Sequence, residues 1–400
     1  MGQVPVAHNE GLNLGLLSEK MSREVVENLF FEKFTNEVIR EGLNDVEKRP
    51  AMAPIQRFVD FTNKGMDHML IPVEKPYTNA PFYGDDIVTG KGEKDKWDYS
   101  RLYINQLQLP VEGPGRMGEQ RVTALNLVAR RRAKLSLLMA RTRETQLVSA
   151  AYEGFSRHIT AAVSVSGLAK SKRYHPNFYV AGSGPSTWSG TVQTHANNIG
   201  ADLDALTGGT SQEFNVDNLE DFRAYVQNIP IEPIEVDGKA FYVMLAHYNQ
   251  IKQLRKDPKF REETSRAGLR GLQNNLFASA EIMYSNFLIF ERAFSVWGVQ
   301  ETDTGGGVYT LQFGATNPLA ALDSFDKKCA ICFGNEFMNE GIATGITIDE
   351  QRQNINNYTE VAIRQIVGFS RNDFYDVDID NSTPTTGKNQ SSAIFTTFSS

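Results

Sequence analysis

The stretch from Glu119 to Glu153, EQRVTALNLVARRRAKLSLLMARTRETQLVSAAYE, decides the fold of this chain. It holds neither proline nor glycine, and its apolar residues recur at helical spacing. The pattern predicts one helix of up to ~35 residues, which at 1.5 Å per residue is about 50 Å long. An average helix in a globular protein has only about 11 to 12 residues. A helix of this length is therefore a distinguishing feature of the fold.

Basic residues gather on this predicted helix. They are Arg130, Arg131, Arg132, Lys134, Arg141 and Arg143. One interpretation is a solvated face supported by pairing with Glu119 and Glu144. The other is a basic surface that faces DNA or an acidic neighbour without reading sequence. Both interpretations stay open at this stage.

Residues 58–115 predict a long β-hairpin that precedes the helix. Two extended segments, Asp67 to Pro76 and Tyr99 to Val111, flank a charged tip from Gly90 to Lys96. An isolated two-stranded ribbon is marginally stable at best. We therefore expect the hairpin to lie on another subunit, with the contacts of its tip made by Lys91, Glu93, Lys94, Asp95 and Lys96.

The N-terminal segment predicts a helix on a loosely composed arm. Its apolar residues follow helical spacing from Ser18 to Leu43, and Pro50 and Pro54 end the pattern. Such an arm has little surface of its own to pack on, so we expect it to dock on a neighbouring subunit.

The chain beyond the long helix alternates loops, helices and strands, which predicts an α+β fold. Residues 155–213 are rich in Ser, Gly, Thr and Asn and predict loops with short elements. The remaining expectations are a helix at 215–227 with Asn215 or Asp217 as its N-cap, a strand pair at 234–246, a helix at 247–256, strands at 282–297 and 308–313, a helix at 326–339, a strand at 358–369 and a frayed tail from 381.

Composition limits the class of protein. The chain has 400 residues, of which 40% are hydrophobic and 22% charged, so it can bury a sizeable core. No apolar run approaches the roughly 18 residues of a membrane span, and the first residues lack the layout of a signal peptide. We expect a soluble protein folded in a cytosol. A net charge of -7 argues against a protein that mainly coats nucleic acid.

Gly113, Gly115 and Gly118 match the G-x-G-x-x-G pattern of dinucleotide-binding proteins. That site needs a helix of ordinary length followed by a second parallel strand with an acidic residue about 20 residues on. Here the helical pattern continues without a break through Arg143. We interpret the glycines as a hinge between hairpin and helix.

The other candidate motifs are incomplete. Cys329 and Cys332 have metal or redox spacing, but the chain has no second cysteine pair and its histidines are scattered, so we expect two buried small hydrophobes. Asp376-Val-Asp378-Ile-Asp380 begins like a calcium loop but lacks its glycine and final glutamate. No catalytic signature appears, which predicts a structural protein with no cofactor and no metal.

In this order, an arm, a long hairpin, a very long helix and an α/β body with a returning strand resemble the major capsid proteins of tailed bacteriophages with the Hong Kong 97-type fold. Three segments carry the likeness at residue level, YVMLAHYNQIKQLR at 242–255, CFGNEFM at 332–338 and YTEVAIRQIVGF at 358–369. These segments look like the corresponding segments in the branch of phage capsid proteins that includes the coat protein of phage N-four.

The resemblance implies five parts: an N-terminal arm at 1–57, an extended loop at 58–116, a peripheral domain with the spine helix and an insertion at 117–233, an axial domain at 234–357, and the returning strand with a tail at 358–400. It implies a subunit of hexamers and pentamers in an icosahedral head around double-stranded DNA, made in the bacterial cytoplasm. Implied partners are a separate scaffolding protein, a portal, decoration proteins and the packaged DNA, with no membrane.

Two alternatives remain at this stage. An encapsulin-type compartment shares the fold but encloses cargo enzymes. A nucleotide-dependent enzyme would use Gly113, Gly115 and Gly118. Particle size separates them, because a shell is a megadalton assembly and an enzyme is a small oligomer.

Overall fold

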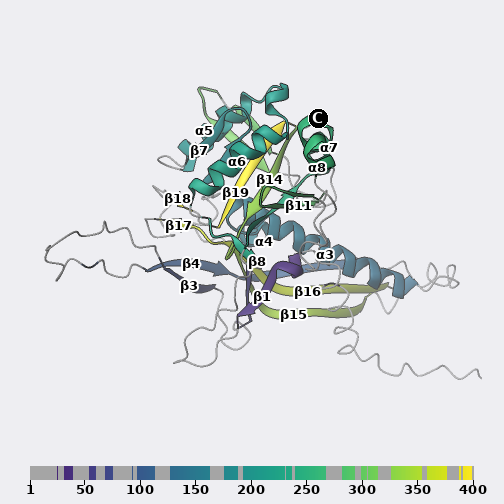
Figure 1. Ribbon diagram of the computed structural model, residues 1–400. Helices are drawn as coiled ribbons and strands as arrows, with labels where there is room; N and C mark the ends of the chain where they lie inside the picture. The colour runs from purple at the N-terminus through teal and green to yellow at the C-terminus, as the bar shows by residue number, and fades with distance from the viewer. Residues whose placement is uncertain are drawn as a thin grey trace, which may run out of the picture.

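The computed structural model describes residues 25, 31–38, 54–59, 68–74, 92, 97–112, 127–162, 175–187, 192–229, 231–236, 239–266, 282–292, 299–303, 305–313, 326–353, 358–375, 387–388 and 391–398. Within these residues two β-sheets carry most of the fold (Figure 1).

A five-stranded sheet lies along the long helix α3, Leu127–Glu153 (Figure 1). Its strand order is β1-β2-β15-β16-β5, with β1 and β2 parallel to their neighbours and β16 antiparallel to both of its own. Inward residues of the sheet form one apolar cluster with Leu135, Met139 and Ala140 of α3. The strands are β1 Thr35–Val38, β2 Ile55–Phe58, β15 Met338–Gln353, β16 Tyr358–Arg371 and β5 Asn105–Glu112.

A second sheet of eight strands has the order β10-β11-β9-β14-β19-β6-β7, and β8 pairs with β9. Its central strands are buried on both faces, so their sequences are nearly continuous apolar runs. Lys239–Ala246 is an example. The strands are β6 Asn177–Val180, β7 Gly184–Thr187, β8 Ile234–Val236, β9 Lys239–Ala246, β10 Ile282–Tyr284, β11 Phe287–Glu291, β14 Lys327–Phe333 and β19 Ser392–Phe398.

Helices cover both faces of this second sheet. The helices α6, Val216–Asn228, α7, Tyr248–Lys256, and α8, Pro258–Arg266, share one apolar cluster with the sheet. On the other face, α5, Val192–Asp204, and the last turns of α3 belong to a different cluster. The eight-stranded sheet is therefore the middle layer of three.

Polar side chains fix the ends of the outer helices. Asn215 caps α6 by accepting from the backbone N–H of Asn218, and His247 caps α7. One carboxylate serves two helix ends: Asp257 accepts from the N–H groups of Val216 and Lys259. These caps lock α6, α7 and α8 into one unit.

Smaller elements complete the described chain. The strands β3, His68–Glu74, and β4, Trp97–Tyr103, form an antiparallel hairpin that projects from the body (Figure 1). The other elements are η1 Phe31–Phe34, α4 Arg157–Ala162, η3 Thr210–Gln212, the pair β12 Val299–Asp303 and β13 Tyr309–Phe313, and the pair β17 Phe374–Tyr375 and β18 Gly387–Lys388.

Several expectations from the sequence are confirmed. The long helix ends at Glu153, Asn215 is an N-cap, and the strands expected at 234–246 and 358–369 are present, the second extending to Arg371. The extended flanks of the hairpin are present in part: β3 and β4 pair, but the second half of the expected segment Tyr99 to Val111 is β5, which joins the five-stranded sheet of the same subunit. The first turns expected for the long helix, before Leu127, lie outside the described residues.

The expected helix at 326–339 is wrong. Lys327–Phe333 is the strand β14, and Met338 begins β15. A central strand buried on both faces has no polar alternation, so its apolar run resembles a buried helix. Cys329 and Cys332 are buried as expected, but on opposite faces of the sheet. Cys329 lies in the cluster with α5 and the last turns of α3, and Cys332 lies in the cluster with α6, α7 and α8.

Three further expectations need correction. In the N-terminal segment, Phe31–Phe34 is a 3-10 turn and Thr35–Val38 a strand, where a helix was expected. The tail does not fray at 392–398, because β19 lies between β14 and β6. Residues 155–213 hold a 13-residue helix, α5, and two strands of the eight-stranded sheet.

The sheets also divide the chain differently from the expected domain boundaries. β15 precedes residue 357 but pairs with β16, and β19 follows residue 358 but joins the eight-stranded sheet. β6 and β7 belong to that sheet as well, although they fall within 117–233. The chain crosses between the sheets more often than a division into consecutive segments allows.

Acidification is expected to destabilise the fold through His175. This ring is fully buried; its Nδ1 accepts from the N–H of Asn177, and Nε2 lies 2.9 Å from Ser392 Oγ. Burial, and then the charges of Arg371 and His195, hold the pKa of His175 well below its usual range. The folded pKa is thus below the unfolded value of about 6.5, so its contribution is complete above about pH 6.5 and falls by about 1.4 kcal/mol for each pH unit below that value.

Unfolding by denaturant at about pH 7.5 and about pH 5.5 measures this effect. A His175→Gln variant keeps a donor near the Nε2 position and cannot become charged. Its loss of stability on acidification should be smaller than that of the wild-type chain. Equal losses in the two proteins would show that His175 does not contribute.

Candidate functional site: a buried charge network

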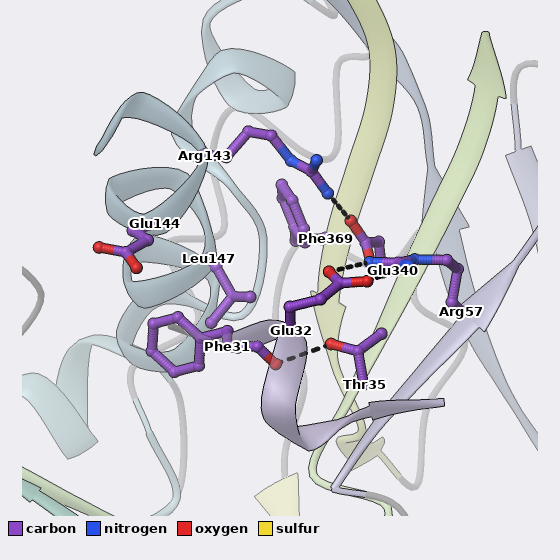
Figure 2. Close-up of a pocket in the computed structure, with 9 residues that line it drawn as sticks. All are labelled: Phe31, Glu32, Thr35, Arg57, Arg143, Glu144, Leu147, Glu340 and Phe369. Carbon is purple, nitrogen blue, oxygen red and sulfur yellow. Dashed lines mark hydrogen bonds and ion pairs between the residues drawn. The ribbon is translucent and has the colours of Figure 1, made fainter. Parts of the chain in front are cut away.

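Four charged residues from four elements meet where the N-terminal segment, the five-stranded sheet and α3 join (Figure 2). Arg57 of β2 donates to both carboxylate oxygens of Glu32 in η1, at 2.7 and 2.6 Å, and its Nε donates to Glu340 of β15 at 2.8 Å. Arg143 of α3 donates to the other oxygen of Glu340. Glu340 therefore joins the helix to the sheet, and Arg57 joins the sheet to the N-terminal segment.

Burial makes these contacts strong and costly to break. The side chains of Glu340 and Arg143 are 2% and 5% exposed, and those of Arg57 and Glu32 are 17% and 27% exposed. Burial alone would raise the pKa of Glu32, but the hydrogen bonds and charge of Arg57 outweigh it, so this pKa is lowered. Burial likewise opposes the charge of Arg57, but the two glutamates raise its pKa above the usual range. The charged forms of Glu32 and Arg57 therefore stabilise each other.

Strand register explains how the sequence builds this network. Arg57 and Glu340 stand directly opposite each other where β2 pairs in parallel with β15. Glu32 comes within reach of Arg57 because Phe31 and Phe34 insert into the large apolar cluster. Thr35 closes the turn by donating to the carbonyl of Phe31. The space among the charged groups is about 10 Å³, no more than one water needs. The network therefore links the N-terminal segment, the sheet and α3, and the space inside it is too small for a ligand.

A second buried charge cluster fixes the C-terminal end of α3. Arg371, at the end of β16, donates to the carbonyl groups of Ala151 and Tyr152 and pairs with Asp373 at 2.6 Å. A cation on the last carbonyl groups of a helix satisfies them and complements the helix dipole. Buried arginines therefore link α3 to its sheet in the middle of the helix, at Arg143, and at its C-terminal end, through Arg371.

The base of the β3–β4 hairpin is held at the same end of the sheet. The ring of Tyr103 packs edge-on against Phe155, with 5.9 Å between ring centres. Asn105 donates to the carbonyl of His158 at 2.8 Å, and the His158 ring lies 2.8 Å from the carbonyl of Val367. Burial lowers the pKa of His158, and the carbonyl of Val367 opposes this effect. The hairpin, α4 and β16 are thus joined at one point.

Comparison with known protein families identifies the family to which this chain belongs. The model of the family described as phage capsid protein matches residues 13–386. The chain belongs to the phage capsid protein family. No curated protein sequence matches the chain.

Solved phage capsids share the fold of this capsid protein. The capsid of Ralstonia phage GP4 superposes with a TM-score of 0.59 at 15% identity, covering 90% of this chain and 94% of that one. The cyanophage Pam1 capsid gives 0.57 at 11% identity, covering 90% and 96%. The capsid of Helicobacter pylori bacteriophage KHP30 gives 0.56 at 11% identity, covering 92% and 91%. The expected α+β Hong Kong 97-type fold is confirmed.

The structure places the basic residues of α3 in different environments. Lys134 is exposed and Arg141 half-buried, and their spacing of seven residues puts them on one side of the helix. Arg143 is a correction to the expected basic face, because it is buried against Glu340 on the side that faces the sheet. Arg131 is half-buried. The side chains of Arg130 and Arg132 lie outside the described residues.

The other sites predicted from the sequence lie outside the described residues. These are the tip residues Lys91, Glu93, Lys94, Asp95 and Lys96 and the hinge glycines Gly113, Gly115 and Gly118. Among the residues that the structure does describe, no group of histidines, cysteines and acids is placed to hold a metal ion. Within the same residues, no helix is long and apolar enough to cross a membrane.

Sequence reasoning missed Glu32, Arg57 and Glu340. Each stands alone among unremarkable neighbours, and the network exists only because β2 pairs with a strand some 280 residues later in the chain. Arg143 was noticed only for its charge. Its apolar surroundings, Phe31, Leu147 and Phe369, are set by tertiary packing.

Replacing Gly368 by alanine is expected to disturb the base of the hairpin in this capsid protein. A Cβ at Gly368 of β16 would overlap the backbone carbonyl of Tyr103, where β4 passes into β5. Overpacking against backbone costs about 1–3 kcal/mol. We therefore expect a lower melting temperature and fewer assembled particles.

Gly345 offers a matched control, because it lies on neighbouring β15 and a Cβ there meets nothing within 4 Å. Gly345→Ala should leave both measurements unchanged. Equal behaviour of the two variants would mean that the close approach of Gly368 to Tyr103 does not hold the hairpin in place.

Proposed function

We propose that this chain is the major capsid subunit of a tailed phage, assembling as hexamers and pentamers of an icosahedral head that encloses double-stranded DNA. The observation that carries the proposal is the family match over 13–386 together with the capsid fold of the described residues. Repeated copies around closed symmetry axes let modest interfaces add up to a stable shell.

The parts of the fold suit this role. In the proposal, α3 and the five-stranded sheet form the peripheral domain, the eight-stranded sheet with its helices forms the axial domain, and the β3–β4 hairpin with its tip extends over a neighbouring subunit. The hairpin's projection from the body in Figure 1 supports this use. The buried charge network would hold the start of the N-terminal arm against both sheet and helix.

The proposed partners are further copies of the chain, a separate scaffolding protein, a portal, decoration proteins and packaged DNA. Contact with DNA would be nonspecific and local, since the chain carries a net charge of -7. The basic surface available for it is narrower than the sequence indicated, because Arg143 is buried. The finished protein would reside in the virion after assembly in the bacterial cytoplasm.

Negative-stain electron microscopy with light scattering tests the proposal on the full chain, expressed alone and with a scaffolding protein. Closed shells or sheets of hexamers support it, and a persistent monomer or dimer under both conditions contradicts it. Shells that enclose an enzyme in place of DNA would favour an encapsulin-type compartment. The dinucleotide alternative is weakened by topology, because β5, which precedes α3, is an edge strand antiparallel to β16.

Removing the hairpin tip from Gly90 to Lys96 is expected to reduce particle yield while leaving the subunit folded. The sequence of the tip is mostly charged residues and glycine, so we expect its removal to leave the core of the subunit intact. Particle yield by sedimentation and subunit folding by circular dichroism measure the two effects. A Gly-Ser replacement of equal length separates the role of the charges from that of length. Unchanged yield after deletion would contradict the role proposed for the tip.

A further inference from the structure

The exposed side of α7 is a basic stripe. Tyr248, Lys252, Arg255 and Lys256 follow the spacing of one helical face, and all four are exposed. The opposite side of α7 is buried through Ile251 and Leu254, in the apolar cluster against the sheet. This helix contains no acidic residue at all. On α8, Lys259 and Arg261 are exposed next to this stripe, together with Glu262.

An acidic stripe lies next to it on α6. Asp217, Glu220 and Asp221 occupy one face of the helix, with Asp217 and Asp221 exposed and Glu220 partly so. Lys259 of α8 bonds both oxygens of Asp217, at 2.7 and 2.6 Å, which places the two stripes side by side. Figure 1 shows α6, α7 and α8 on the same side of the body.

Helix dipoles and ion pairs within the subunit explain some of these charged residues but not all of them. Arg255 and Lys256 in the last turn of α7, and Asp217 in the first turn of α6, complement the helix dipoles. Lys252 is in the middle of α7 and Asp221 in the second turn of α6, where that effect has faded. Among the described residues, Lys252 and Lys256 meet no carboxylate within ion-pair distance. Tyr248 also exposes 37% of its surface.

We propose that the basic stripe of α7 docks on the acidic stripe of α6 in a second copy of this chain. The inference rests on the proposed function, because it assigns a contact between subunits of the shell. The two stripes lie side by side and carry opposite charges, so the same surface of a second copy, related by a two-fold axis, sets each stripe against its complement. An aromatic residue among the basic side chains suits a protein interface.

DNA suits this surface less well than a second copy does. The acidic stripe lies beside the basic one, joined to it by the Lys259–Asp217 pair. The separation between the paired Lys259 and Asp217 is well within the distance of about 8 Å over which charges act at physiological salt. A duplex laid on α7 would lie beside Asp221 and beside two carboxylates that already have cationic partners, Asp217 with Lys259 and Glu220 with Arg223. A second copy that presents both stripes meets complementary charge on each.

Charge reversal and exchange test the interface on the full chain under conditions in which the wild-type chain forms shells. Lys252→Glu with Lys256→Glu should lower the yield of closed particles at least about tenfold, because like charges then face each other across every contact. Adding Glu220→Lys and Asp221→Lys to the same chain exchanges the two signs and should restore particles. Lys239→Glu, at an exposed lysine outside both stripes, is the matched control.

Loss of particles on reversal and recovery on exchange support the interface, provided that circular dichroism shows folded subunits throughout. Normal particle yield after reversal overturns it. Normal particles with weakened binding to a nonspecific DNA duplex also overturn it and assign the stripe to DNA. Loss on reversal without recovery on exchange overturns the pairing with α6. Failure of the wild-type chain to form particles under any condition would instead contradict the proposed function.

Discussion

Replacing Glu340 by glutamine is expected to destabilise the subunit by about 3–5 kcal/mol, because it leaves a buried guanidinium without its counter-charge. Arg143 is 5% exposed and its bond to Glu340 is its ion pair within the network. Its Nε has no hydrogen-bond partner among the described residues. Arg57 keeps Glu32 as a partner after the change, so most of the loss falls on Arg143.

Denaturant unfolding of the full chain, followed by tryptophan fluorescence, measures this loss. The double variant Arg143→Met with Glu340→Gln removes the buried cation as well, and its stability should return most of the way to wild type, since replacing both partners of a buried pair is often nearly neutral. Glu32→Gln is a milder control because that carboxylate is 27% exposed. A loss below about 1 kcal/mol for Glu340→Gln would mean that water reaches Arg143 and compensates it.

The network also carries a consequence for assembly. Glu340 forms ion pairs with both Arg57 and Arg143, so its loss removes the charged link between the N-terminal segment and α3 and leaves their apolar contact. A subunit that folds but holds its arm loosely would assemble poorly. Particle yield of the double variant, which restores stability but not the link, separates these two effects.

Elements with a local cause could be predicted from the sequence. The C-terminal part of α3 follows from an uninterrupted run of helix-forming residues, and Asn215 marks the start of α6 by its own chemistry. The two strands of the hairpin could be predicted from the prolines and glycines that flank them. The family resemblance rested on the order of these elements, and the match over 13–386 confirms it.

Elements with a distant cause could not be predicted. The strand β19 is rich in Ser and Thr, which indicates a solvated tail when the sequence is read alone. In the fold those side chains are buried and satisfied: Thr397 accepts from Gln250 at 2.8 Å, and Ser392 bonds His175. The strand β14 was mistaken for a helix because burial on both faces removes the alternation that marks a strand. The charge network has no local signal at all.

The second large effect is expected at Phe222, the centre of the layer between α6 and the eight-stranded sheet. Its ring is fully buried and stacks on Phe395 of β19 with 4.7 Å between ring centres and 11° between planes. It also stacks on Phe287 of β11 at 5.9 Å and meets Tyr179 of β6 edge-on. One ring of α6 therefore contacts three separate strands.

Phe222→Ala is expected to cost about 3–5 kcal/mol, since it removes a buried ring and leaves a cavity that four packed elements cannot easily close. Phe222→Leu keeps most of the volume and should cost less than about 1.5 kcal/mol. Because α6 carries the acidic stripe, loosening it should also reduce particle formation, whereas an exposed change such as Ala224→Ser on the same helix should alter neither measurement. Urea unfolding and particle yield measure the two effects, and an alanine variant as stable as the leucine variant would contradict the central packing role assigned to the ring of Phe222.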